Sequence, residues 1–533
     1  MSSKSNKNTK YIFVTGGVIS GVGKGITAAS IGAVLKAKNL RVSMQKCDPY
    51  FNIDAGLLNP AEHGECFVTF DGAETDLDLG SYERFLNKNM SEDSIVTSSK
   101  LFKRLLENER ADKFHGKSVQ MVPHFTGLIQ DTFEEVANKA KSDIHIVEIG
   151  GSIGDLESGH FVEAIREFSG RVGRENCFYI HVVFVPYLST SHEFKTKPAQ
   201  NALRDLRETG IIPDMVVVRA DQKTVPDSQS ISKKLSIFSG VKSSSIIVLP
   251  NSSSVYDAPL NVVKAGALKP IDEFISQKTP DMSLWKDLNR KISAIKSKTV
   301  KVGLVAKYIK NTDTYLSVTE ALKSAAWANN VDLEIIWINA ETAKNEDFAA
   351  VDGILVPGGF GTRGVEGKIY AATYALKNNK PYLGLCLGLQ VAVIAAARIG
   401  GLSAATSEEI EPNSPENVVY IMDSQKGKES TGGTLRLGNY KAKLLTGSLA
   451  EKIYGTSEIT EHHRHRYEVN QSFTDKIQAG GLTISGLSPD GKLVEFVESP
   501  RNDFFIATQA HPEFKSRPAQ PHQLFDAFIK SLL

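Results

Sequence analysis

Short apolar runs alternate with longer amphipathic segments along most of the chain. In its first half these runs occupy residues 11–15, 41–46, 144–149, 179–186, 215–219 and 245–249. Apolar runs of this length, separated by segments with helical periodicity, are typical of parallel strands buried between helices. The first half is therefore predicted to fold as a parallel sheet covered by helices.

A second series of the same kind begins near residue 300. Its apolar runs occupy residues 301–308, 333–338, 353–356, 382–385 and 504–508, and a charged stretch separates the two series. A chain of 533 residues also exceeds what one hydrophobic core usually supports. We expect an α/β protein with two doubly wound, mainly parallel-sheet domains. The predicted divisions are a flexible tail at 1–9, a domain at 10–276, a linker at 277–299 and a domain at 300–533.

Charge and cysteine content narrow the classes of function. The net charge is +1 and no basic cluster dominates, which argues against a general nucleic-acid or membrane surface. The four cysteines are scattered without Cys-x-x-Cys spacing, as expected in a reducing cytoplasm. No apolar segment is long enough for export or for a membrane span. We therefore expect a cytoplasmic enzyme for small molecules, with no nucleic-acid and no membrane partner.

Cys386 has the sequence setting of a catalytic nucleophile. Gly384 and Gly388 stand two residues to either side, and an apolar run precedes it. A sharp turn from strand to helix needs such small residues, and it exposes the nucleophile at the carboxyl edge of a sheet. Downstream, His511 and Glu513 have the spacing of a base and the acid that orients it. Together the three residues predict acyl transfer through a thioester.

This half of the chain resembles the class I glutamine amidotransferases. The resemblance rests on the Pro-Gly-Gly-Phe-Gly segment at 357–361, the turn at Cys386, and the pair of His511 and Glu513. It implies hydrolysis of glutamine with release of ammonia. It also implies an oxyanion hole made by the backbone N–H groups of Gly359 and Leu387.

A glycine-rich turn follows the first apolar run. Residues 16–25 include Lys24, so backbone N–H groups and an ammonium can surround a phosphate there. The strict P-loop pattern fails, because Val18 takes the first glycine position and Gly25 follows the lysine. The position between a strand and a helix favours a phosphate site, and a plain glycine turn is the alternative.

Two acidic segments add the oxygen ligands that a nucleotide site needs for Mg²⁺. Asp76 and Asp78 lie in the polar segment 71–80, and Glu148 lies near the end of the apolar run at 144–149. A carboxylate at the carboxyl end of a strand, beside a phosphate turn, is well placed to hold Mg²⁺ together with nucleotide oxygens. The combination with the glycine-rich turn predicts a magnesium–nucleotide site.

Several segments together resemble the CTP synthase family over nearly the whole chain. They are residues 16–25, 46–50, 62–65, 71–80, 147–151, 195–198 and 464–470. The resemblance implies ATP-dependent amination of UTP to CTP, in which O4 of UTP is phosphorylated and channelled ammonia from glutamine displaces the phosphate. It implies an amino-terminal amidoligase domain of P-loop type and a carboxyl-terminal glutaminase domain.

The family resemblance also assigns residues to each ligand. ATP contacts are expected from Gly21, Val22, Gly23, Lys24, Gly25, Lys46 and Asp78. Magnesium ligands are expected to be Asp78 and Glu148. UTP or CTP contacts are expected from Ser20, Asp155, Glu157, Lys195, Lys197, Gln200 and Lys234. Glutamine contacts are expected from Gln390, Glu408 and Arg466, although Glu409 directly follows Glu408 and leaves the register open.

The resemblance extends to regulation and assembly. It implies a homotetramer, feedback inhibition by CTP, and activation by GTP at a glycine-rich lid that residues 361–367 resemble. Two alternatives stay open. Another glutamine-dependent amidoligase would lack the lysines at 195 and 197, and a non-catalytic filament or scaffold would have no need of Lys24, Cys386 or His511.

Overall fold

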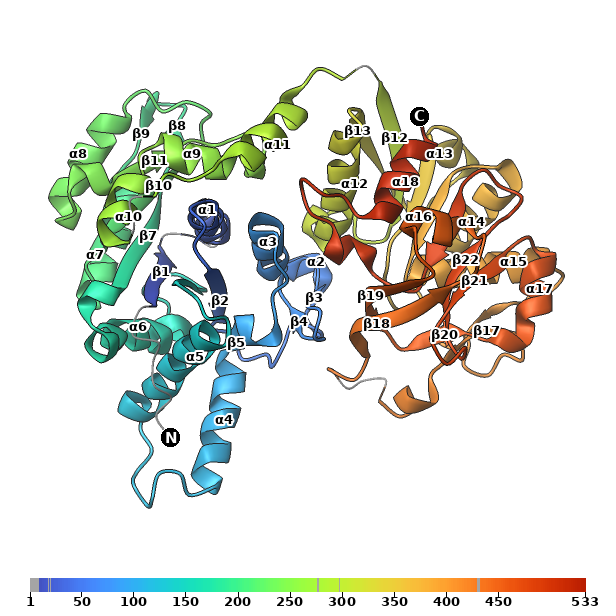
Figure 1. Ribbon diagram of the computed structural model, residues 1–533, viewed down its shortest axis with the longest axis horizontal. Helices are drawn as coiled ribbons and strands as arrows, with labels where there is room; N and C mark the ends of the chain where they lie inside the picture. Colours follow the sequence, from blue (N-terminus) through green and yellow to red (C-terminus); the bar gives the residue numbers. More distant parts are fainter. Residues whose placement is uncertain (1–8, 18, 20, 276–277, 297, 429–431) are drawn as a thin grey trace. The chain divides into compact units, whose positions relative to one another are not determined.

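The computed structural model of the chain describes residues 9–17, 19, 21–275, 278–296, 298–428 and 432–533. It divides into two units (Figure 1). The first unit contains the chain up to residue 53 together with residues 81–290. The second unit contains residues 54–80 together with residues 291–533.

A seven-stranded sheet forms the centre of the first unit, in the order β11-β10-β7-β1-β6-β2-β5. All of its neighbouring strands run parallel. The strands are β1 (Lys10–Gly16), β2 (Val42–Asp48), β5 (Ile95–Thr97), β6 (Ile144–Ile149), β7 (Cys177–Val185), β10 (Met215–Ala220) and β11 (Ile246–Leu249). The apolar runs predicted for this half are confirmed as strands, and the short β5 was not predicted.

Each face of this sheet has its own helices, because successive strand residues point to opposite sides. Tyr11 and Phe13 of β1 share a buried core that includes residues of three successive helices. These are α4 (Ser98–Arg110), α5 (Thr126–Lys139) and α6 (Gly159–Val172). On the other face, Gly32 of α1 (Lys24–Ala37) lies so close to Met44 that a Cβ would be 3.3 Å from the sulfur. The sheet is therefore doubly wound.

The remaining elements of the first unit surround this sheet. The helices α7 (Lys197–Glu208) and α8 (Ser228–Ser239) share a core with β7, β10 and β11. The others are β8 (Tyr187–Leu188), β9 (Glu193–Phe194), α9 (Ala258–Lys264), α10 (Leu268–Phe274) and α11 (Ser283–Ser293). Of the tail predicted at 1–9, residues 1–8 lie outside the described residues. Thr9 is buried, and its hydroxyl donates to the Ser142 carbonyl at 2.9 Å.

The strand order puts the predicted nucleotide segments at one edge of the first sheet. β1 lies between β6 and β7, so the chain reverses its winding direction at β1. In open parallel sheets, ligands bind outside the carboxyl ends of the strands at such a switch point. The glycine-rich turn follows β1, the 150–157 segment follows β6, and the 186–200 segment follows β7.

A nine-stranded sheet forms the centre of the second unit, in the order β13-β12-β14-β15-β23-β22-β21-β18-β19. The first five strands run parallel, and the rest are antiparallel. The parallel strands are β12 (Thr299–Ala306), β13 (Asp332–Asn339), β14 (Gly353–Val356), β15 (Tyr382–Leu385) and β23 (Phe505–Thr508), which confirms the second predicted series. The antiparallel strands are β18 (Arg436–Leu444), β19 (Glu458–His465), β21 (Thr483–Leu487) and β22 (Val494–Glu498).

Helices cover both faces of the parallel part of this second sheet. Val305 faces a core shared with α14 (Val365–Asn378) and α15 (Leu387–Ile399), whereas Leu304 faces a core shared with α12 (Leu316–Ala328) and α18 (Gln523–Ser531). The other helices are α13 (Asn345–Ala349), α16 (Leu449–Tyr454) and α17 (Thr474–Ala479). A small sheet contains β16 (Thr406–Ser407), β17 (Asn417–Ile421) and β20 (Tyr467–Val469).

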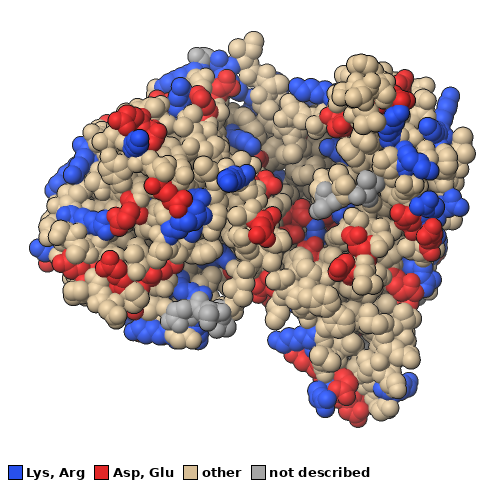
Figure 2. All heavy atoms as spheres, turned by 180° about the vertical axis from the view of Figure 1, so that it is seen from behind, with Lys and Arg blue, Asp and Glu red and all other residues tan. Residues whose placement is uncertain are grey.

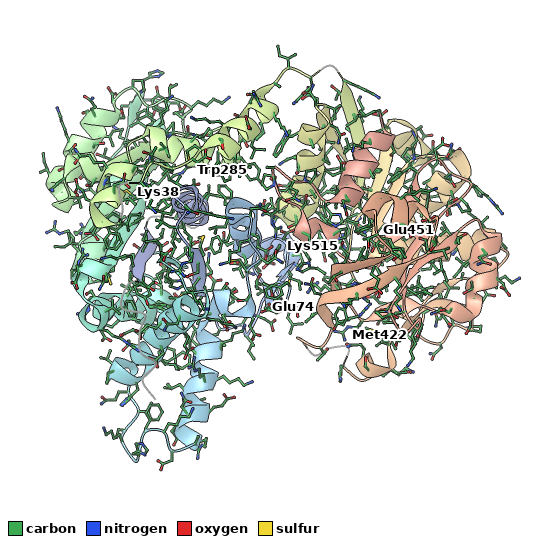
Figure 3. All side chains as sticks on the ribbon, viewed as in Figure 1. Lys38, Glu74, Trp285, Met422, Glu451 and Lys515 are labelled. Carbon is green, nitrogen blue, oxygen red and sulfur yellow. The ribbon has the colours of Figure 1, made fainter. Side chains whose placement is uncertain are left out.

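Residues 54–80 pack with the second unit, although the sequence places them between two parts of the first. They contain α2 (Pro60–His63), the hairpin of β3 (Phe67–Val68) and β4 (Glu74–Thr75), and the start of α3 (Leu77–Leu86). Glu74, on that hairpin (Figure 3), accepts a hydrogen bond from Arg464 Nε at 2.8 Å. Glu65 accepts one from the Ser317 N–H at 2.7 Å. The domain boundaries predicted at residues 276 and 300 remain a prediction. The contacts within the structure place the insertion at residues 54–80 in the second unit.

The surface carries charges of both signs. On the face drawn in Figure 2, lysines and arginines are interspersed with aspartates and glutamates. This distribution agrees with the net charge of +1. Among the described residues, no helix is both long enough and apolar enough to cross a membrane.

Candidate active sites

Cys386 occupies a tight turn between β15 and α15. Its φ is +51°, a left-handed value that is uncommon for a residue with a side chain. A Cβ on Gly384 would lie 2.7 Å from the Gly388 carbonyl oxygen, and a Cβ on Gly388 would lie 2.3 Å from the Val356 carbonyl oxygen. Only glycine fits at either position, which is the physical reason for the pattern that flanks Cys386.

His511 and Glu513 lie next to one another directly after β23. His511 Nδ1 and Glu513 Oε1 are 2.7 Å apart, and both side chains are buried. Burial disfavours the imidazolium, but Glu513 and Cys386 outweigh burial and raise the pKa of His511 to about 10. The structure thus brings the three predicted residues together, and Nε2 is the ring nitrogen that remains for Cys386.

The loop after β14 lies against these three residues. A Cβ on Gly358 would be 2.7 Å from His511 Cε1 and 3.6 Å from Cys386 Cβ. A Cβ on Gly359 would be 3.3 Å from Leu387 Cδ2. Leu387 is the first residue of α15, so its N–H is among those that a helix leaves unpaired at its start. The two predicted oxyanion donors therefore come from adjacent segments beside the nucleophile.

A cavity of about 90 Å³ opens beside the same loop. Its walls come from the loop, from the His511 segment and from the insertion at residues 54–80. Among its lining residues are Gly358, Gly359, Phe360, His511, Glu65 and Cys66. The insertion thus forms part of the surroundings of the candidate glutaminase site.

Gln390 lies behind the nucleophile rather than in the open cavity. It is buried in α15, and its Nε2 donates to the Tyr467 carbonyl at 3.1 Å and to Gln509 Oε1 at 3.3 Å. Gln509 Nε2 in turn lies 3.7 Å from Cys386 Sγ. A hydrogen bond therefore links Gln390 of α15 to Gln509, just after β23, and Gln509 in turn contacts the Cys386 thiol.

Glu408 and Glu409 point in different directions. Glu408 Oε2 accepts a hydrogen bond from the Ile421 N–H at 2.8 Å, whereas Glu409 Oε1 accepts one from the Gly361 N–H at 2.7 Å. Burial raises the pKa of Glu409, and that hydrogen bond and the Arg466 guanidinium act in the opposite direction. The geometry brings Glu409, rather than the predicted Glu408, to the loop beside Cys386. Nothing in the sequence distinguishes these two neighbours.

The glycine-rich turn between β1 and α1 has the backbone that an anion site needs. Gly21 and Gly23 have φ values of +75° and +92°, which residues with side chains rarely adopt. Lys24 is the first residue of α1, Gly25 follows it, and Lys24 Nζ donates to the Gly151 carbonyl at 2.7 Å. Ser20, a predicted UTP contact, lies outside the described residues.

A buried cluster of charged groups lies at the carboxyl ends of β2 and β6. Lys46 Nζ is 3.1 Å from Glu148 Oε1 and 3.9 Å from Asp48 Oδ1. The Tyr82 hydroxyl donates to Glu148 Oε2. Two predicted residues, Lys46 and Glu148, are thus brought together.

Asp78, the other predicted magnesium ligand, lies in the part of the chain that packs with the second unit. It stands in the first turn of α3, where its N–H donates to Asp76 Oδ1 at 3.1 Å. Within the described residues, no group of three or more histidine, cysteine, aspartate or glutamate side chains is arranged to hold a metal.

Of the residues predicted to contact UTP, those at 155 and 157 follow β6, those at 195–200 follow β7, and Lys234 lies in α8 after β10. Lys195 and Lys234 both lower the pKa of Glu193. The largest effect comes from the hydrogen bond that Lys195 donates to Glu193, and the charge of Lys234 adds to it. Gln200 Nε2 donates to the Thr196 hydroxyl at 2.9 Å, which fixes the side chain at the start of α7. Of the others, Lys197 begins α7 with an exposed side chain, Asp155 accepts from the Ser152 N–H at 2.8 Å, and Glu157 is exposed.

Arg219 is a candidate site residue that the sequence did not reveal. It lies in β10, two strands away from β1, yet a Cβ on Gly23 would be 3.3 Å from its Nε. Burial lowers the pKa of this guanidinium. A lone arginine in an apolar strand carries no sequence signal for a phosphate site, and only the sheet order brings it to the turn.

Comparison with known families matches the two halves of the chain to two different families. Residues 10–276 match a family described as "CTP synthase N-terminus", and residues 311–531 match one described as "Glutamine amidotransferase class-I". The CTP synthase of Methanocaldococcus jannaschii is 47% identical over 541 residues, covering 99% of each chain. The CTP synthase of Bacillus subtilis is 46% identical over 528 residues, covering 98% of each chain.

Among solved structures, the glutaminase domain of a Trypanosoma brucei CTPS with bound acivicin is similar to part of the chain. It is 39% identical and covers 44% of this chain and 93% of that one, with a TM-score of 0.41.

Proposed function

The chain belongs to the CTP synthase family, and we propose from that premise how its residues divide the work of the reaction. It converts UTP to CTP at the expense of ATP, with glutamine as the nitrogen donor, and is a ligase with glutaminase activity. The single observation that carries this conclusion is the similarity over nearly the full length of the Methanocaldococcus jannaschii CTP synthase. A non-catalytic scaffold is not favoured, because a scaffold has no need of Cys386, His511 and Glu513.

Cys386 is the proposed nucleophile for glutamine. Its thiolate attacks the amide carbon, the C–N bond breaks, and a glutamyl thioester forms. His511 supplies the proton that the leaving ammonia takes, and Glu513 on Nδ1 keeps Nε2 directed at the reacting atoms. The negative charge on the amide oxygen is stabilised by the N–H groups of Gly359 and Leu387. Water then hydrolyses the thioester, which releases glutamate and restores the thiol.

Lys24 and the glycine-rich turn are the proposed phosphate site for ATP. Transfer of the terminal phosphoryl group to O4 of UTP creates a leaving group, which ammonia displaces from C4 with release of phosphate. The backbone N–H groups of residues 21–25, with Lys24 and Lys46, would bind the phosphate oxygens. Lys195, Lys197 and Gln200, with Asp155 and Glu157, are proposed to bind UTP or CTP, because they follow β6 and β7 at the carboxyl edge of the sheet. Lys234, in α8, is proposed to join them because its charge acts on Glu193 together with that of Lys195.

Mg²⁺ is part of the proposal, with Glu148 and Asp78 as its ligands. Both offer carboxylate oxygens, which Mg²⁺ prefers, and Glu148 lies at the carboxyl end of β6. Mg²⁺ commonly takes only one or two carboxylates and completes its shell with water and phosphate oxygens, so a two-carboxylate set fits. The bound ion would neutralise part of the charge on the ATP phosphates.

Regulation and assembly follow from the family and remain proposals for this chain. We propose activation by GTP near residues 361–367, feedback inhibition by CTP, a homotetramer, and a cytoplasmic location. This segment carries Arg363 as a candidate partner for an anionic activator. Its guanidinium lies over the Tyr308 ring at 5.1 Å and is 3.2 Å from Glu341 Oε2, a carboxylate that an anionic activator would replace.

Omitting one component at a time tests this function. CTP formation, followed by the absorbance change of the base, should occur with UTP, ATP, Mg²⁺ and an ammonium salt. It should also occur when glutamine and GTP replace ammonium. Leaving out ATP or Mg²⁺ should stop both reactions, and leaving out GTP should slow only the glutamine reaction. Absence of CTP under every condition would contradict the proposal.

The two neighbouring glutamates provide a matched test of glutamine recognition. Glu409→Gln should raise the KM for glutamine about 10- to 100-fold, because a hydrogen bond to a charged group is worth about 1.5–3 kcal/mol. Glu408→Gln should leave KM nearly unchanged, because its carboxylate faces the Ile421 N–H. Steady-state glutamine hydrolysis measures both. The reverse ranking would return the role to Glu408.

A further inference from the structure

Lys368 is a buried lysine directly beside the candidate oxyanion loop. It lies on α14 with 1% of its surface exposed, among apolar residues of the same helix. Its Nζ donates to the Pro357 carbonyl at 3.2 Å. A Cβ on Gly359 would be 3.4 Å from that Nζ, so the ammonium lies next to the backbone that carries one proposed oxyanion donor.

A second lysine holds the other end of the same loop. Lys307, just after β12, donates from Nζ to the Phe360 carbonyl. The N–H of the same peptide group, which belongs to Gly361, donates to Glu409 Oε1 at 2.7 Å. The carbonyls on either side of the two loop glycines are therefore each fixed by an ammonium group. Holding the peptide groups on both sides restricts the direction in which the Gly359 N–H between them can point.

Among the described residues, no neighbouring carboxylate balances the charge of Lys368. In the described part of the chain, no carboxylate forms an ion pair with it, and Cys386 is the group whose negative charge acts on it. An ammonium buried without a counter-ion is costly, and a methionine would fill the same space at no such cost. The negative charges that do arise here belong to the reaction, namely the Cys386 thiolate and the oxygen of the tetrahedral intermediate.

We propose that Lys368 is a positioning residue of glutamine hydrolysis, which orients the Gly359 N–H through the Pro357 carbonyl and balances the negative charge that develops at Cys386. The proposal rests on the glutaminase function proposed above. It adds a group that does not touch glutamine and that no triad or oxyanion motif contains.

The electrostatic surroundings give this role a pH dependence. Burial and Lys307 lower the pKa of Lys368 to about 7, and Cys386 acts in the opposite direction. Other charged groups near the loop are Glu409, which faces Gly361, and His511, which faces Gly358. Arg363 and Glu341 pair with each other at 3.2 Å and both act on Lys307. Lys368 loses its proton as the pH rises through this lowered pKa, so its positive charge is present below about pH 7 and absent at higher pH. An arginine at 368 would keep its charge there.

Two substitutions at 368 and one control test the proposal. Lys368→Met should lower kcat for glutamine hydrolysis about 100-fold with little change in KM, as for loss of an oxyanion-hole donor. CTP formation from ammonium should be retained. Lys368→Arg should recover much of kcat, and the alkaline fall in its pH profile should move to higher pH. Lys377→Met, on the exposed side of the same helix, should behave like the parent.

Three results would overturn the proposal. One is a Lys368→Met protein that keeps kcat within about threefold, which is below the effect of one donor. Another is a Lys368→Arg protein whose alkaline limb coincides with that of the parent. The third is a Lys368→Met protein that loses ammonium-dependent activity while Lys368→Arg fails to restore kcat, because the residue would then serve only packing. Failure of the glutaminase assignment itself would appear separately, as glutamine hydrolysis that survives Cys386→Ala.

Discussion

Replacing Cys386 with alanine is expected to abolish CTP formation from glutamine while sparing CTP formation from ammonium. Loss of a catalytic nucleophile typically lowers kcat by at least about 10⁴-fold. The thiol lies in the second unit, whereas Lys24 and the proposed UTP residues lie in the first. Substitutions at separate, independent sites have separate effects, so the ammonium rate should stay within about twofold of the parent. Initial rates of CTP formation with each nitrogen source measure both effects.

Cys177→Ala is the matched control for this substitution. Cys177 is also buried and free, but it starts β7 in the first unit. It should retain both nitrogen routes. A Cys386→Ala protein that still uses glutamine would contradict the proposed nucleophile.

Replacing Lys24 with alanine should impair both nitrogen routes together. Lys24 begins α1 at the glycine-rich turn, and we propose that it binds ATP phosphates. Removing one group that stabilises a transferring phosphoryl typically costs about 10²–10³-fold in kcat. Because phosphorylation of UTP precedes the entry of nitrogen, the source of ammonia makes no difference. CTP formation from ammonium and from glutamine should therefore fall by the same factor.

Lys103→Ala serves as the control, since Lys103 is an exposed lysine on α4 of the same unit. It should leave both rates unchanged. Retention of ammonium-dependent synthesis by Lys24→Ala would refute the proposed phosphate site.

The sequence was most informative where local patterns determine the structure. The buried parallel strands were predictable because each one is a short apolar run between helical segments. The turn at Cys386 was predictable because only glycine fits at 384 and 388, as the close approach of the Gly388 and Val356 carbonyls demonstrates. The antiparallel strands of the second sheet escaped prediction, because one-sided burial mixes polar residues such as Lys441 and Lys443 into β18.

Residues 54–80 could not be assigned to a unit from sequence. Their strands are two residues long, and the contacts that hold them are distant along the chain. Glu65 and Ser317 are 252 residues apart, and Glu74 and Arg464 are 390 apart. Composition and periodicity carry no information about such pairs. Only the folded structure joins this insertion to the second unit.

The candidate site was predictable in its reacting groups and not in its supporting ones. Cys386, His511 and Glu513 belong to motifs with recognisable spacing. Glu409 and Lys368 do not, because a glutamate beside another glutamate, or a lysine in an amphipathic helix, usually belongs to a solvated face. Burial against the loop after β14 is what distinguishes them.

The most direct test of two separate reactions in one chain compares three proteins with two nitrogen sources. The rate of CTP formation should be measured for the parent, Cys386→Ala and Lys24→Ala, each with ammonium and with glutamine plus GTP. The parent should use both sources, Cys386→Ala should use only ammonium, and Lys24→Ala should use both about 10²–10³-fold more slowly. Glutamine-dependent synthesis by Cys386→Ala, or ammonium-dependent synthesis by Lys24→Ala at the parent rate, would contradict the account.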